Sequence, residues 1–383
     1  MKVSGIRHTF REILEDSRSL GFILTICTSF SLILSNGDNS SQYIAFWNTE
    51  TIFSSSIHLP HSFLHWINDG LMSIFFFLAG LEIKRELLEG ELKEPKKALL
   101  PIFAAIGGML VPAVVYTLVN KGGEFANGWG IPMATDIAFS LGITSLLGKR
   151  VPLSLKVFLI ALAIIDDLGA ILIIAVFYGG QINWLMLGAS VALILLIAIL
   201  ARKKVSLSLR LILGICLWYL IFNSGIHATV AGVALAFTVP LRELGDLEHR
   251  LHIPVNFLIL PIFALANTAV SFNTGIMETL THPINFGIMA GLVIGKPLGI
   301  VAFCYMLTQM KWGKLPAGTS WTQISGIGML AGIGFTMSIF ITTLAFTSTD
   351  TQDLAKVSIL LASLLSLILG CSTLYFTNSR SSF

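Results

Sequence analysis

The chain has 383 residues, of which 55% are apolar and only 12% are charged, with a net charge of +3 and a mean hydropathy of +0.83. Soluble globular proteins carry about 25% charged residues, so this composition excludes an ordinary soluble domain. Apolar runs continue from Leu20 to Phe376 without a linker rich in Pro, Ser or charge. The sequence therefore predicts a single membrane unit over residues 1–383.

A membrane-spanning helix needs about 20 mostly apolar residues. By this criterion we expect an all-α polytopic membrane protein with about twelve transmembrane helices. The expected spans, in chain order, are 20–36, 62–84, 98–119, 126–147, 152–178, 183–201, 207–222, 224–240, 251–272, 285–308, 323–347 and 355–377.

Basic residues are distributed unevenly between the loops that join these spans. Of the 24 Lys and Arg residues, 21 fall on one face, whereas Lys121 and Lys356 fall on the other and Lys296 lies inside a span. Cytoplasmic loops carry the excess of basic residues. We therefore expect both termini in the cytoplasm.

The first outside loop, residues 35–60, is the longest and contains no Lys or Arg. Within it, aromatic and β-branched residues flank the turn-former Asn48 over Gln42–Phe53. This pattern is compatible with a short β-hairpin and equally with an irregular loop.

Four ionisable residues fall inside expected spans, where a charge costs about 2.5–3.5 kcal/mol on insertion scales and indicates function. They are Asp136, Asp166, Asp167 and Lys296. Asp166 and Asp167 are neighbours about 100° apart on one helix, so both can border one polar cavity. Two close carboxylates in a low dielectric do not both ionise cheaply, so at least one should hold a proton near neutral pH.

A hard cation such as Na⁺ or Li⁺ binds oxygen ligands and would compete with protons for the two carboxylates. This competition is the minimum chemistry for cation/proton exchange. A hydrogen-bonded pair that only packs helices is the bland alternative, although helix packing in membranes usually relies on small residues. Lys296 is either a counter-ion to one carboxylate or a structural charge, and a buried lysine can itself release a proton.

Two expected spans contain helix-breaking sequences. Gly128, Gly130 and Pro132 precede Thr135 and Asp136 in the fourth span, and glycines recur through 326–334 in the eleventh. Irregular backbone at membrane depth is tolerated where it is buried in protein or lines a cavity. Paired interruptions in the two halves of a transporter indicate its binding site, so spans 3–5 and 10–12 would be inverted repeats.

At these residues the chain closely resembles the NhaA family of bacterial sodium/proton antiporters. The resemblance runs over almost the whole length, and the following segments carry it: 80–86, 134–139, 165–170, 225–229, 247–249, 295–297 and 332–340. It departs from the family pattern at Ala269, where a glycine is expected.

The resemblance implies that Asp166 and Asp167 bind the cation and exchange the protons. Thr135 and Asp136 would belong to a mid-membrane crossing of two broken helices, with Lys296 facing them and spans 3–5 and 10–12 forming the core. It further implies electrogenic exchange, a bacterial inner-membrane location among lipid, and a homodimer formed through loop 40–58.

The family also has a cytoplasmic pH-response cluster and a further carboxylate of less certain role in the second span. Asp69 matches that carboxylate. The cluster positions are Glu82, Glu86, Glu248, His249 and His252, and His227 at a span boundary is a further candidate for shaping the pH profile. Acids and histidines packed close together can titrate as a group near neutral pH. The alternatives are a solvated charge cluster at the membrane edge and, for His227, an ordinary packing histidine. His58, His61 and His65 are interpreted as outside-surface residues.

The predicted function is therefore Na⁺(Li⁺)/H⁺ antiport by alternating access, with Asp166 and Asp167 as the metal-binding residues. The sequence predicts no enzyme activity, no cofactor and no nucleic-acid partner. The main alternative is a sodium-coupled symporter for a small organic anion. Intramembrane aspartyl proteases and prenyl-chain enzymes fit less well, because the aspartates are adjacent and Asp167 is not followed by a third acid.

Overall fold

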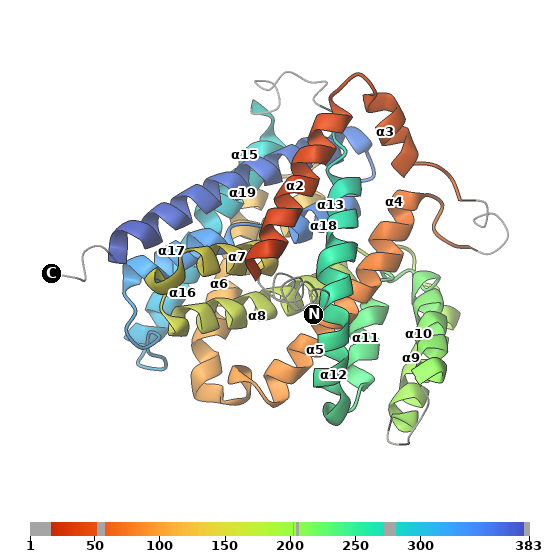
Figure 1. The fold of residues 1–383 in the computed structure, drawn as a ribbon, viewed down its shortest axis with the longest axis horizontal. Helices are drawn as coiled ribbons and strands as arrows, with labels where there is room; N and C mark the ends of the chain where they lie inside the picture. The colour runs from red at the N-terminus through yellow and green to blue at the C-terminus, as the bar shows by residue number, and fades with distance from the viewer. Residues whose placement is uncertain (1–16, 52–57, 202, 204–206, 272–280, 379–383) are drawn as a thin grey trace, which may run out of the picture. The chain divides into compact units, whose positions relative to one another are not determined.

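A computed structural model describes residues 17–51, 58–201, 203, 207–271 and 281–378 (Figure 1). The chain divides into two compact units. The first unit comprises Met1–Ile26, Glu91–Ala170 and Val270–Phe383, and the second comprises Cys27–Gly90 and Ile171–Ala269. Each unit therefore combines segments that are far apart in the sequence.

The first unit is built from helices that come from separate segments of the sequence. They are α6 (Pro95–Val119), η3 (Ala126–Met133), α7 (Ile137–Leu146), α8 (Leu153–Phe177, which ends in the second unit), α15 (Pro283–Met289), η6 (Ala290–Gly295), α16 (Lys296–Gln309), α17 (Trp321–Ala331), α18 (Phe335–Ala345) and α19 (Thr349–Asn378), with the start of α2 (Ser17–Ser35) and the short turns η2 (Glu91–Lys93) and η4 (Gly148–Arg150). Helix α6 packs along α16, and α17 packs along α19.

The second unit contains the remaining helices. They are α3 (Ser40–Trp47), α4 (Phe63–His65), η1 (Trp66–Leu71), α5 (Met72–Leu88), α9 (Trp184–Leu200), α10 (Leu207–Phe222), α11 (Val230–Thr238), α12 (Leu241–Pro254), η5 (Val255–Ile259) and α13 (Leu260–Asn267). Helix α5 packs on α11, and α9 packs on α10. Small side chains allow the first contact, since Gly80 lies against Ala236 and Gly232 lies against the backbone of Ser73.

Seven of the described helices are long and apolar enough to cross a membrane. The pair α17 and α18 passes the same test as one span bent by 47°, while α9 and residues 209–222 of α10 are apolar but shorter. The described part of the chain is thus a nearly all-helical polytopic membrane protein.

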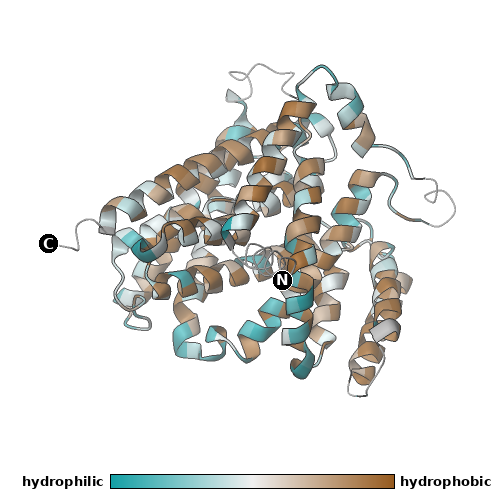
Figure 2. Ribbon diagram, viewed as in Figure 1, coloured by the Kyte–Doolittle hydropathy of each residue, from teal (hydrophilic) through white to brown (hydrophobic). Residues whose placement is uncertain are grey.

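The outward-facing side chains fit a lipid environment. Leu153, Leu185 and Trp184 are 77%, 78% and 73% exposed, although soluble monomers rarely expose extended apolar surface. Figure 2 shows apolar residues over most helices and hydrophilic residues gathered on α12. Because apolar side chains gain nothing by facing water, this distribution agrees with immersion of the long helices in lipid.

The β-hairpin considered for residues 42–53 is wrong over its described part, because residues 40–47 form the helix α3. Tyr43 and Trp47, four residues apart, make an edge-to-face contact with ring centroids 6.0 Å apart, and such spacing places them on one helical face. The Tyr43 hydroxyl also donates to the Leu265 carbonyl at 3.1 Å. An isolated bridge between Glu50 and Ser62 is present, and residues 52–57 lie outside the described part.

A reciprocal glycine contact brings the backbones of α6 and α16 together. A Cβ atom added to Gly107 would lie 2.3 Å from the carbonyl oxygen of Gly299, and one added to Gly299 would lie 2.0 Å from that of Gly107. Both distances are far below van der Waals contact. Neither position has room for a side chain unless the two helices separate.

We therefore expect Gly107→Ala to destabilise the protein by about 1–3 kcal/mol, the usual cost of overpacking. Gly188→Ala in α9 is the matched control, because an added Cβ there meets nothing within 4 Å and alanine is the better helix former. Thermal unfolding of the purified proteins in detergent measures both effects. Equal melting temperatures for the two variants would show that the close contact is not limiting.

Candidate ion-binding site

The aspartate pair lies in the middle of α8, and both side chains are buried. Asp166 is 1% exposed and Asp167 is 5% exposed. Lys296, at the first position of α16, is fully buried, and its Nζ lies 3.0 Å from Oδ2 of Asp166. The Lys296 ammonium also donates to the Met133 carbonyl, and the charge of Asp167 acts on it as well. Lys296 and Asp166 thus form a buried ion pair.

Thr135 joins this ion pair to the helix interruptions. Its hydroxyl lies 2.7 Å from Oδ2 of Asp166 and 3.0 Å from the carbonyl oxygen of Ala331. A hydroxyl has one proton to donate, so it serves one of these acceptors at a time. If Asp166 is ionised, Thr135 donates to it. If Asp166 carries a proton, the carboxyl can donate to Thr135, which then donates to Ala331. Thr135 therefore accommodates both protonation states.

Asp136 lies at the start of two short helices. It is the N-cap of α7, where its Oδ1 accepts the backbone N–H of Phe139 at 3.1 Å. Its Oδ2 accepts the backbone N–H of Thr336 at 3.0 Å and the Thr336 hydroxyl, at the first turn of α18. Helix N-termini carry partial positive charge, which stabilises there a carboxylate that is 2% exposed.

The two helix interruptions are held directly against each other. The chain is non-helical at residues 134–136 between η3 and α7, and at 332–334 between α17 and α18. The Asp136 N–H donates to the Ile333 carbonyl at 2.7 Å. The Ser140 hydroxyl donates to the Leu330 carbonyl, and the Ser338 hydroxyl donates to that of Ile131, at 2.9 and 2.7 Å. Backbone groups released by each interruption are therefore satisfied by the other.

Oxygen atoms suited to a hard cation gather around Asp166. Its Oδ2 and the hydroxyl of Thr135 are in contact, the Ala331 carbonyl oxygen lies 3.0 Å from that hydroxyl, and Asp167 is the next residue. The buried Oδ1 of Asp166 accepts no hydrogen bond from the described residues. A buried oxygen without a donor is costly, and a bound proton or cation would satisfy it.

The acidic residues expected to respond to pH lie around Arg85 in the second unit. Arg85 of α5 pairs through Nε with Oε2 of Glu248 on α12 at 2.9 Å, and through Nη2 with Glu86 at 3.5 Å. Glu82 lies three residues before Arg85 in the same helix α5, a spacing that places both side chains on one face. Arg85 therefore pairs with two of the expected acids, Glu86 and Glu248, and Glu82 lies on the same helix face.

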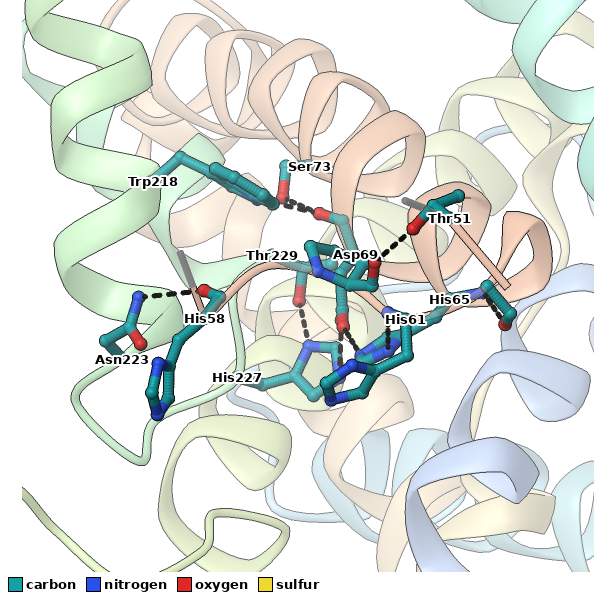
Figure 3. A network of polar contacts seen from close by, with 12 residues as sticks. Thr51, His58, His61, His65, Asp69, Ser73, Trp218, Asn223, His227 and Thr229 are labelled. Carbon is teal, nitrogen blue, oxygen red and sulfur yellow. Dashed lines mark hydrogen bonds and ion pairs between the residues drawn. The ribbon is translucent and has the colours of Figure 1, made fainter. Parts of the chain in front are cut away.

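The expected histidines make contacts in other places as well. His252 accepts from the Asn256 amide at 3.0 Å, and His249 is exposed on α12. His227 lies at the start of α11, with Nε2 3.1 Å from Oδ1 of Asp69 (Figure 3). Near the other end of α11, the Lys84 ammonium donates to the Phe237 carbonyl.

Sequence reasoning missed three contacts at the candidate sites. Thr336, the partner of Asp136, lies 200 residues away in the chain, and only its position just after the second interruption could have indicated it. Arg85 was noted only as part of a motif. His65 was interpreted as a surface residue, yet its Nε2 lies 2.6 Å from Oδ2 of Asp69, and their spacing of four residues in a helix was the available signal.

Long apolar helices, paired helix interruptions and an aspartate–lysine pair buried beside them define a multi-pass membrane protein with ionisable groups buried among its helices. Residues 11–374 match the Na⁺/H⁺ antiporter 1 family, and the chain belongs to that family.

Individual relatives agree over nearly the full length. The chain is 49% identical to the Na⁺/H⁺ antiporter NhaA 1 of Flavobacterium johnsoniae, over 94% of this chain and 95% of that protein. It is 47% identical to the antiporter NhaA of Flavobacterium psychrophilum, over 98% and 97% of the two chains. For NhaA of Bordetella parapertussis, the identity is also 47%, over 92% and 93%.

Proposed function

We propose that this protein is an electrogenic Na⁺(Li⁺)/H⁺ antiporter that extrudes sodium from the cytoplasm in exchange for protons. Its family consists of transporters, so it is not an enzyme, and the adjacent pair Asp166–Asp167 beside Lys296 is the observation that carries the proposal. Members named as Na⁺/H⁺ antiporters match it over nearly their whole length. The sodium-coupled symporter considered from the sequence is not favoured.

Exchange follows from competition for the carboxylate oxygens. A sodium ion that binds Asp166 and Asp167 replaces positive charge held there, namely the Lys296 ammonium on Asp166 and bound protons. The displaced protons leave toward the cytoplasm, because two close buried carboxylates do not keep both a cation and their protons. After sodium leaves on the other side, protons reload the site and Lys296 returns to Asp166.

Electrogenicity follows if more than one proton is released for each sodium ion bound. Each cycle then moves net positive charge inward. The membrane potential contributes about 2.3 kcal/mol per net charge for each 100 mV. This contribution lets the cell extrude sodium against its gradient.

Alternating access is assigned to the first unit, which carries the site and the two interruptions. We interpret η3–α7 and α17–α18 as two broken helices that cross at mid-membrane and belong to inverted repeats. Together with α9, α10 and α11, they raise the seven long helices to the expected count of about twelve spans. Asp136 would neutralise the facing helix N-termini at the crossing.

Regulation by pH is assigned to Glu82, Glu86 and Glu248 around Arg85, with His249 and His252 on the same helix α12. Protonation of these acids removes the negative charge that attracts Arg85, so the contact between α5 and α12 weakens as pH falls. His227 would influence the pH profile from its separate position on Asp69.

The unequal distribution of basic residues supports a bacterial inner-membrane protein with both termini in the cytoplasm. Reactivity of single cysteines placed near residues 97 and 121 toward a membrane-impermeant reagent would test this orientation. Loop 40–58, including α3, is the proposed contact of a homodimer in the lipid bilayer. Chemical crosslinking through a cysteine at Ser41 would test it.

The function is tested in everted membrane vesicles from a bacterial host that lacks its own sodium/proton antiporters. Respiration acidifies the vesicles, and a ΔpH-sensitive dye reports proton release on addition of Na⁺, Li⁺ or K⁺. We expect Na⁺ and Li⁺ to collapse ΔpH and K⁺ to leave it unchanged. If no cation gives a response between about pH 6 and 9, the exchange proposal fails and the symporter becomes the better interpretation.

A further inference from the structure

The connection between α16 and α17, residues 310–320, lies at one end of the first unit. Both helices belong to spans that are apolar enough to cross a membrane, as do α6 and α8. Gly313 of the connection lies beside the Leu100 side chain in the second turn of α6, and the Ala317 carbonyl accepts the Ser154 hydroxyl at the start of α8 at 2.8 Å. Four membrane-spanning helices therefore begin or end around this connection, which places it at the level of the lipid headgroups.

Helix α16 ends in a Schellman motif whose left-handed residue is a lysine. The Trp312 N–H donates to the Leu307 carbonyl at 3.2 Å, and the Lys311 N–H donates to the Thr308 carbonyl at 3.1 Å. These two bonds define the motif, and glycine is usual at its left-handed position because a side chain is unfavourable there. Lys311 has a φ of 60°, the one positive φ of a residue other than glycine in the described part of the chain. A lysine held in this conformation points to a role for its ammonium group.

The two lysines of the connection carry uncompensated positive charge. Lys311 and Lys314 are both exposed, and the chain contains no Asp or Glu from α15 to α18. The acids near the start of α6 are Glu91 and Glu94, and both pair with Lys97, at 3.9 and 3.1 Å. Within the part of the chain that the structure describes, neither Lys311 nor Lys314 forms an ion pair. An anionic partner would therefore gain the full attraction of both ammonium groups.

Amphipathic and apolar side chains accompany the two ammonium groups. Trp312 is 59% exposed, and Tyr305 and Met310 near the end of α16 are exposed as well. The Tyr305 ring packs edge-to-face on Trp321, the first residue of α17, with ring centroids 5.6 Å apart. Tryptophan and tyrosine favour the membrane–water interface because they combine an apolar ring with a polar group. One short segment thus offers apolar contacts for acyl chains and positive charge for a phosphate.

Two ordinary explanations account for part of this pattern. Basic residues are frequent in cytoplasmic loops, and a cation near the C-terminus of a helix interacts favourably with the helix dipole. Neither explanation requires the unfavourable φ of Lys311. A glycine at the left-handed position with a lysine next to it would satisfy both. The conformation of Lys311 therefore calls for a partner that needs the ammonium at this position.

We propose that Lys311, Trp312 and Lys314 form a binding site for the headgroup of an anionic phospholipid. The two ammonium groups bind the phosphate oxygens as compact charges, and the Trp312 ring lies against the glycerol region. The acyl chains pass along α16 beside Tyr305 and Met310. A zwitterionic lipid carries the same phosphate, but its own ammonium compensates the phosphate charge and repels the two lysines. The site therefore prefers an anionic lipid.

Quenching of tryptophan fluorescence by brominated lipids measures this preference. The protein is reconstituted in phosphatidylcholine bilayers, in which brominated phosphatidylglycerol or brominated phosphatidylcholine replaces a rising share of the lipid. The contribution of Trp312 is the emission that is lost in the same protein carrying Trp312→Phe. Each lysine near an anionic surface strengthens binding about fivefold. The preference for phosphatidylglycerol at Trp312 should therefore fall about fivefold in Lys311→Gly and disappear in Lys311→Gly/Lys314→Gln.

Lys311→Gly also separates lipid binding from folding. Glycine is the residue preferred at this φ, so the variant should unfold in phosphatidylcholine at the wild-type temperature or above it. Lys121→Gln, at an exposed lysine outside the connection, should leave the lipid preference unchanged.

An unchanged preference in Lys311→Gly would overturn the proposal. Loss of thermal stability in Lys311→Gly without loss of the preference would assign the lysine to the helix dipole instead. Displacement of the lipid by soluble glycerol phosphate would also overturn it, because the site would then bind a free anion. The measurement uses no ion gradient, so its result is independent of the exchange experiment.

Discussion

Asp166→Asn and Asp167→Asn are each expected to abolish Na⁺- and Li⁺-induced collapse of ΔpH in everted vesicles. Each substitution keeps the size of the side chain but removes a negative charge from the cation site. Two unit charges about 4 Å apart interact by about 4 kcal/mol at an effective dielectric constant of 20, equivalent to roughly 10³-fold weaker cation binding. The substituted position also loses its exchangeable proton, so raising the sodium concentration should not restore exchange.

Asp38→Asn is the matched control, because Asp38 is exposed in the loop after α2. This variant should exchange like the wild type across the pH range. The amount of each protein in the membrane is measured by immunoblot, so a silent variant is distinguished from a missing one. Exchange at wild-type rates by either Asp166→Asn or Asp167→Asn would falsify the assignment of the site.

Lys296→Met is expected to destabilise the protein strongly, by about 3–5 kcal/mol, whereas the double variant Lys296→Met/Asp166→Asn should recover most of the loss. The single change leaves Asp166 buried without its counter-ion, and an unpaired buried charge costs this much. The double variant has no unpaired charge at either of these two positions. Lys296 and Asp166 are 3.0 Å apart, so strong coupling between the substitutions is expected.

Thermal unfolding of the purified variants measures this coupling. The penalty of Lys296→Met should shrink as pH falls, because protonation neutralises the stranded Asp166 carboxylate. Lys121→Met, at an exposed lysine, controls for loss of a positive charge alone. Equal melting temperatures for the single and double variants at neutral pH would show that the ion pair does not stabilise the fold.

Most helices could be predicted because a long apolar segment is typical of a membrane-spanning helix and of few other structures. The expected spans 98–119 and 152–178 became Pro95–Val119 and Leu153–Phe177. The short segment around α3 was harder, since eight residues with aromatic groups at 43, 46 and 47 satisfy a helix and a hairpin almost equally. Tertiary contacts decide between a helix and a hairpin in such a segment, and here they are the contacts of Tyr43 with Ser31 and Leu265.

The sequence indicates which ionisable residues are buried in the apolar helices, but it does not indicate how they pair. A charge in an apolar run is visible in the sequence, so Asp136, Asp166, Asp167 and Lys296 were identified. Which of them pair depends on packing between helices, and Asp136 binds Thr336 while Lys296 selects Asp166. The contact of His65 with Asp69 escaped notice because a histidine beside the start of a span resembles an ordinary interfacial residue.

The glycine contact between α6 and α16 has a mechanical consequence for Lys296, which lies three residues before Gly299. Where two backbones touch without intervening side chains, no rotamer change can absorb sliding of one helix along the other. The two helices must therefore travel as one rigid piece, with the root of Lys296 fixed to both. Release of the ammonium from Asp166 then depends on rotation about the bonds of the lysine side chain or on displacement of α8. One of these two motions limits the conformational change in a transport cycle.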